Sequence, residues 1–161
     1  CGVWGQLIEP GESPEPPWQG TYHLWISLAG TLAATAMHGL VFTYFMGTGR
    51  WVRETVEVYE LAPGLILAGK ALRRRARSAG MGGFGLLLVA VALGAATDTR
   101  AMVSLLGIPA GTIHHVAGLV AVAANLVGFY VEYEALDGNG RLIEEVLVHV
   151  RRIRVERGLP V

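Results

Sequence analysis

The stretch GMGGFGLLLVAVALGAA at residues 80–96 contains no charged residue, and it lies inside an uncharged run that extends over 78–97. A helix needs about 20 predominantly apolar residues to cross a bilayer, and this run has that length. Two other uncharged runs are as long, one at 24–45 and one at 101–131, in which the span is best placed at 112–131. The sequence therefore predicts an all-α integral membrane protein with three transmembrane helices.

The composition agrees with a membrane location. Of 161 residues, 52% are apolar and 16% are charged, whereas soluble domains carry about 25% charged residues. The formal net charge is +0, and the clustered basic excess typical of nucleic-acid-binding proteins is absent, so we expect no nucleic-acid partner. Cys1 is the only cysteine, which excludes a disulfide framework and a cysteine-based zinc site within one chain.

The basic residues predict the orientation. Seven Lys and Arg residues lie between the first and second runs, five follow the third run, and Arg100 alone lies on the other side. Short loops rich in Lys and Arg stay in the cytoplasm. We therefore expect the N-terminus outside and the C-terminus in the cytoplasm, in a multi-pass protein of the bacterial inner (cytoplasmic) membrane.

These patterns divide the chain into seven parts. They are a periplasmic Pro-rich tail (1–21), a first transmembrane helix (22–46), a cytoplasmic amphipathic basic loop (47–77), a second transmembrane helix (78–97), a short periplasmic connection (98–111), a third transmembrane helix (112–133) and a cytoplasmic C-terminal helix (134–161). Apolar residues at helical spacing predict amphipathic helices at 50–61, 65–77 and 141–157. Pro109 and Gly111 end the apolar piece that precedes the third span, which predicts an interfacial turn or a short helix there.

Two features favour contacts with other molecules. Small residues recur at helical spacing in the spans, for example Gly30 and Ala34 before His38, and such faces let helices approach closely, either each other or another integral membrane subunit. A basic run suits anionic lipid headgroups or an acidic partner; it consists of Arg73, Arg74, Arg75 and Arg77.

The depths of the histidines in the membrane restrict which cofactors the three spans can bind. At 1.5 Å per residue, His38 and Asn125 both lie roughly 20 Å from the outer membrane surface, on small-residue faces of the first and third spans. Because an unpaired polar group in lipid is costly, we expect these two side chains to contact each other. His114 and His115 lie within about 5 Å of that surface, so neither reaches the level of His38, and a bis-histidine haem fails by well over 10 Å. A haem or chlorophyll with one axial ligand at His38 stays open as an alternative.

A metal site at the outer surface is not expected. His23, Asp98, His114 and His115 are ligand types for zinc or copper, but no helical metal-binding motif accompanies them. Adjacent histidines on a helix also point about 100° apart, so at most one of His114 and His115 joins the others easily.

Cys1 predicts a lipid attachment. A cysteine at the first position, on the outer side and followed by glycine and a Pro-rich tail, is typical of processed bacterial lipoproteins. The alternative is that the numbering simply begins there. An intact mass of the N-terminal peptide distinguishes the two.

No catalytic constellation is visible. Ser27 and Ser104 have no evident base, and we expect Glu132 and Glu134 to face water at the inner interface. The glycines at 80–85 lie at the start of a span and do not form a phosphate-binding loop. We therefore expect no enzyme.

The remaining features of the sequence favour contacts with neighbouring membrane subunits. We expect a non-catalytic accessory or scaffold subunit of a larger bacterial membrane complex, such as an electron-transport, respiratory or photosynthesis assembly, that contributes helix packing and peripheral contacts. The alternative is a small cofactor-binding membrane protein that carries haem or chlorophyll through His38.

Overall fold

The computed structural model describes the backbone of residues 17–98, 104–105 and 108–160, and the side chains of 22–97 and 108–160. Within these residues it contains three long helices: α1 (Pro17–Val58), α2 (Gly64–Asp98) and α3 (Ala110–Glu156). Each helix is long and apolar enough to cross a membrane. The protein is therefore all-helical, and its three helices fit a multi-pass membrane protein. Cys1, Arg100 and the side chain of Asp98 lie outside the described parts.

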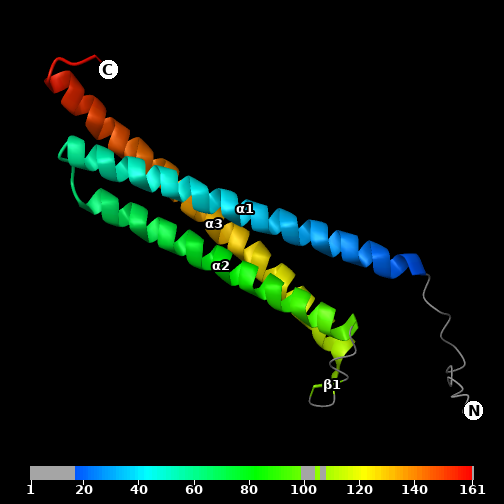
Figure 1. Cartoon of the computed structure of the whole chain (residues 1–161). Helices are drawn as coiled ribbons and strands as arrows, with labels where there is room; N and C mark the ends of the chain where they lie inside the picture. Colours follow the sequence, from blue (N-terminus) through cyan, green and yellow to red (C-terminus); the bar gives the residue numbers. More distant parts are fainter. Residues whose placement is uncertain (1–16, 99–103, 106–107, 161) are drawn as a thin grey trace, which may run out of the picture.

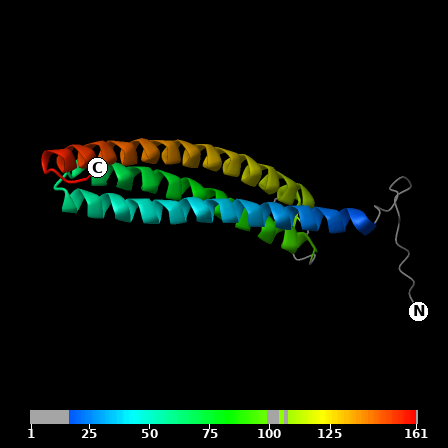
Figure 2. The same ribbon diagram turned by 90° about the horizontal axis from the view of Figure 1, so that it is seen from above.

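The three helices lie side by side, as Figure 1 shows. The α1–α2 turn and the C-terminal end of α3 lie at one end, which we call the turn end. The C-terminal end of α2 and the start of α3 lie at the other, the connection end. The most extensive contact is between α2 and α3, and α1 packs mainly against α2. Figure 2 shows the same elongated bundle from above, with the N-terminal end of α1 projecting beyond α2 and α3.

The helices continue far beyond the apolar runs. The structure does not support separate amphipathic helices at 50–61, 65–77 and 141–157, because each of these segments extends a membrane-length helix. No proline stands at the junctions near residues 47, 78 and 134, so the backbone hydrogen bonds continue through them. The first break comes after Val58, and Pro63 stands directly before α2.

Even the glycine-rich stretch at 137–140 stays helical. A Cβ on Gly138 would lie 3.0 Å from the side chain of Leu72, so the glycine allows α3 to lie close to α2. Asn139 is almost completely buried, and its amide donates a hydrogen bond to the Tyr44 hydroxyl over 3.2 Å. Tertiary packing therefore overrides a local composition that otherwise favours a turn.

The connection between α1 and α2 is a tight turn. Between α1 and α2, Glu60 has a φ of 53°, and the Leu61 amide donates to the Val56 carbonyl over 2.9 Å, which ends α1. Between α2 and α3, β1 (Ser104–Leu105) pairs with β2 (Ile108–Pro109) in antiparallel fashion. The segment expected as an interfacial turn or short helix thus contains a small strand pair, and α3 begins directly after Pro109.

The core follows one face of α3. The buried residues of α3 are spaced alternately four and three residues apart, except for the last step, which is four again. This pattern keeps one side of a long helix against its neighbours. The buried residues are Ala121, Asn125, Gly128, Glu132, Ala135, Asn139, Leu142, Val146 and Val150. The largest apolar group, which we call the turn-end cluster, consists of Val52, Val56, Leu61, Leu65, Leu142, Val146 and Val150. A smaller group of Phe45, Ala76 and Ala135 lies next to it along the bundle.

The other half of α1 is much less covered. From Tyr22 to Met37 every side chain is exposed except those of Thr31 and Ala34, which are half-buried. The covered part of α1 begins at His38, which is 9% exposed.

Candidate functional site

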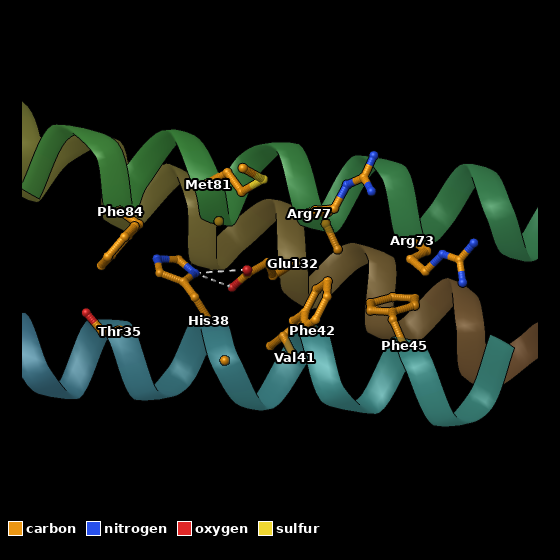
Figure 3. A pocket seen from close by; sticks show the side chains of 13 residues that line it. Thr35, His38, Val41, Phe42, Phe45, Arg73, Arg77, Met81, Phe84 and Glu132 are labelled. Carbon is orange, nitrogen blue, oxygen red and sulfur yellow. Dashed lines mark hydrogen bonds and ion pairs between the residues drawn. The ribbon is translucent and has the colours of Figure 1, made fainter. Parts of the chain in front are cut away.

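Three buried polar side chains meet between the apolar cores and the exposed half of α1. His38 comes from α1, and Asn125 and Glu132 come from α3; they are 9%, 5% and 3% exposed. We call these three residues the polar cluster. Figure 3 shows His38 and Glu132 turned toward each other in the space between α1 and α2, with α3 behind.

The structure brings His38 and Asn125 together. His38 Nε2 lies 3.0 Å from Asn125 Oδ1. The Asn125 amide nitrogen donates to the carbonyls of Gly83, over 3.1 Å, and Ala121, over 2.7 Å. Because both amide hydrogens are used on carbonyls, Oδ1 is the atom that faces the histidine, and Nε2 must carry the hydrogen and donate it.

Glu132 completes the cluster, and the prediction that it faces water at the interface is wrong. Both of its carboxyl oxygens lie near His38 Nδ1, at 2.9 and 3.0 Å. The physical reason is its position on α3. Glu132 follows Asn125 by seven residues, which is about two helical turns, so the face that buries Asn125 also buries Glu132. This spacing is the sequence signal that could have identified it.

The hydrogen-bond donors and acceptors around His38 and Glu132 indicate how many protons these two side chains carry together. Since His38 donates through Nε2, Nδ1 is either an acceptor in the neutral ring or a second donor in the imidazolium. A neutral ring beside an ionised carboxylate would set two acceptors against each other at 2.9 Å, although both side chains are buried. One proton is therefore shared between Nδ1 and Glu132, and the pair is neutral overall in either arrangement.

Glycines of α2 make room for this cluster. A Cβ at Gly80 would lie 2.6 Å from Glu132 Oε1, and a Cβ at Gly83 would lie 3.0 Å from Asn125 Oδ1. Phe129 of α3 stacks on the His38 ring with centroids 4.8 Å apart. Backbone, aromatic ring and polar partners thus enclose the imidazole, and no buried side-chain nitrogen or oxygen among the described residues lacks a hydrogen-bond partner.

This enclosure bears on His38 as a cofactor ligand. An axial ligand to iron or magnesium needs an imidazole nitrogen with a free lone pair. Nε2 faces Asn125 and Nδ1 faces Glu132, so each nitrogen already has a partner within the chain. Ligation would break one of these bonds and leave a buried polar group unpaired.

The histidines of the connection end form a looser group. His114 Nδ1 donates to the Ala90 carbonyl over 3.1 Å, and the His23 ring meets the His114 ring edge-on with centroids 6.0 Å apart. His115 bonds back to the Gly111 carbonyl of its own helix over 2.7 Å. Among the described side chains, no three His, Cys, Asp or Glu residues are grouped so that they could hold a metal ion.

The arginine run divides into different surroundings. Arg75 pairs with Glu134 of α3 over 2.6 Å, and Glu134 also accepts a hydrogen bond from the Tyr130 hydroxyl over 3.0 Å. Arg73 and Arg77 instead line a groove between α1 and α2, which Figure 3 shows from close by. Within this run, Arg75 thus has an acidic partner on α3, and Arg73 and Arg77 line the groove.

No protein-family model, no curated protein sequence and no solved structure matches this chain.

Proposed function

We propose that this protein is a non-catalytic accessory or scaffold subunit of a larger bacterial membrane complex, with its N-terminus outside and its C-terminus in the cytoplasm. The observation that carries the proposal is the uncovered half of α1. From Tyr22 to Met37 this helix presents almost all of its surface away from its own chain.

Small residues in this half suit a neighbouring helix. Gly30 has no atom within 4 Å of the position that a Cβ would take, and Thr31 and Ala34 beside it are only half-buried. In membranes, helix association depends on close backbone approach at such residues. The face that α1 buries at His38 thus continues toward the connection end without a partner that fills it.

The polar cluster supports the same role. It links α1 to α3 through buried hydrogen bonds to both ring nitrogens of His38. Each interhelical hydrogen bond in a membrane contributes only about 0.6–2 kcal/mol, but an unpaired polar group would cost more. A bonded cluster therefore determines how α1 is set against α3 and favours a rigid surface for another subunit.

The orientation proposal rests on charge. The Lys and Arg residues lie at the turn end and in the C-terminal part of α3, apart from Arg100. Such segments remain in the cytoplasm. Anionic lipids of that leaflet are then the expected neighbours of the basic run Arg73, Arg74, Arg75 and Arg77.

The alternative, a haem or chlorophyll carrier through His38, has less support. Its one favourable observation is that His38 also lines the open α1–α2 groove. Against it stand the two hydrogen bonds that occupy the ring nitrogens.

The test is to isolate the tagged chain from its own membranes in a gentle detergent and to identify the proteins retained. We expect larger membrane subunits in fixed stoichiometry, and recovery of the chain alone would refute the proposal. Gly30→Leu should reduce co-purification, because it fills the open face. Leu32→Phe adds bulk on the opposite side of the same stretch and serves as the matched control. A visible absorption band that His38→Ala removes, while assembly persists, would favour the cofactor carrier instead.

A further inference from the structure

The groove between α1 and α2 has a volume of about 260 Å³ and is open on one side. Its walls are mainly apolar, and the polar cluster contributes His38 and Glu132 to its inner surface; the apolar lining includes Val41, Phe42, Phe45, Met81 and Phe84. Figure 3 shows the two phenylalanines of α1 and the Phe84 ring directed into the space between the helices.

Two arginines stand at the turn-end part of this groove. The structure shows no acidic partner for Arg73 or Arg77 among the described residues, whereas Arg75 between them in sequence pairs with Glu134. A guanidinium nitrogen of Arg73 lies 3.4 Å from the position of a Cβ on Gly49, so this side chain extends from α2 across to α1. The groove therefore has an apolar body and a positively charged mouth.

The dimensions match a lipid lying along the helices. Arg73 and Phe84 are eleven residues apart on α2, which corresponds to about 16 Å. The charged residues directly precede the uncharged run that begins at Ser78, and the apolar lining continues into that run. A phospholipid in a bilayer has the same polarity, with its phosphate at the interface and its acyl chains toward the centre.

We propose that the α1–α2 groove binds one anionic phospholipid, with an acyl chain along the phenylalanine-lined wall and the phosphate between Arg73 and Arg77. Charge complementarity favours this occupant over a helix of another subunit, since an apolar helix would leave both guanidinium groups without counter-charge. The groove itself belongs to the isolated chain, so the proposal does not depend on the accessory-subunit role.

The test is native mass spectrometry of the purified full chain in a mild detergent, titrated with phosphatidylglycerol or with phosphatidylcholine of the same acyl composition. We expect one phosphatidylglycerol to bind at least about fivefold more tightly than phosphatidylcholine, from an attraction of the order found for single basic residues at anionic surfaces. Arg73→Gln and Arg77→Gln should each weaken phosphatidylglycerol binding by about fivefold. Arg74→Gln is the matched control, because Arg74 belongs to the same run but not to the groove lining.

A second pair of variants tests the acyl-chain position. Gly39 lines the groove and has open space beside it, so Gly39→Leu should occupy the groove and abolish preferential binding without touching the arginines. Gly47 also has open space but does not line the groove, and Gly47→Leu should bind as the wild type does. Equal binding of the two lipids would overturn the proposal. So would equal losses in Arg73→Gln and Arg74→Gln, or unchanged binding in a folded Gly39→Leu protein.

Discussion

Gly80 of α2 lies so close to Glu132 of α3 that a Cβ at position 80 would stand 2.6 Å from the carboxyl oxygen Oε1. Real Cβ atoms essentially never come so near, so the missing side chain is what admits a buried carboxyl group between the helices. The same backbone approach leaves Glu132 only 3% exposed and directs both of its oxygens toward His38.

Gly80→Ala should therefore destabilise the protein, because either the carboxyl group or the backbone of α2 must move. Overpacking of a buried contact costs about 1–3 kcal/mol. The change is measurable as a lower unfolding midpoint in detergent micelles or nanodiscs. Gly82→Ala is the control on the same helix, since nothing lies within 4 Å of its Cβ position and alanine favours the helix. Equal destabilisation by both substitutions would contradict the close approach.

The shared proton leads to a prediction at position 132. Glu132→Gln keeps a hydrogen-bond donor toward His38 Nδ1 and should stay within about 1 kcal/mol of the wild type. Glu132→Ala removes the partner of Nδ1 and leaves a cavity, and it should lose about 1–3 kcal/mol. Equilibrium unfolding of the two variants under the same conditions decides the matter. A glutamine variant as unstable as the alanine variant would mean that a neutral donor at this position is not enough.

The proposed orientation is testable by cysteine labelling in intact cells. In a Cys1→Ser background, the Lys70→Cys variant should be protected from a membrane-impermeant maleimide. The His115→Cys variant should react with the same reagent. Both side chains are exposed in the structure, so poor access within the protein does not explain protection. The reverse labelling pattern would invert the topology, and permeabilised cells provide the positive control for position 70.

The α1–α2 turn gives a prediction outside the apolar spans. Glu60 adopts a φ of 53°, a conformation that costs an L-residue about 1–2 kcal/mol relative to glycine. Glu60→Gly should therefore raise the unfolding midpoint, whereas Glu57→Gly, in the last turn of α1, should lower it because its backbone is helical. A lower midpoint for Glu60→Gly would show that the glutamate side chain contributes more than the backbone strain removes.

Uncharged runs were sufficient to predict the three membrane-length helices, because hydropathy alone reports which segments lipid can surround. Helix ends were predicted less well. The edges of the apolar runs predict helix ends there, but a helix ends where its backbone hydrogen bonds are broken, as they are between Val58 and Gly64. Asn139 shows the same effect, since its contact with Tyr44 across 95 residues is invisible to local pattern.

The candidate site was visible only in part. Their equal depth in the membrane predicts a contact between His38 and Asn125, and in the structure His38 Nε2 lies 3.0 Å from Asn125 Oδ1. Glu132 was placed in water because it is the first charged residue after an apolar run. What buries it is the glycine at position 80 of another helix, and a single sequence does not show which helix faces which.

The unbroken course of α3 has a mechanical consequence. Its 47 residues extend over about 70 Å, while the hydrocarbon core of a bilayer is about 30 Å thick. Asn125 holds α1 by a polar bond, and Val150, about 38 Å further along the same rod, lies in the turn-end cluster. A helix clamped at two distant points resists torsion between them. The two contacts therefore fix the rotation of α3 relative to α1 at both ends of this segment of about 38 Å.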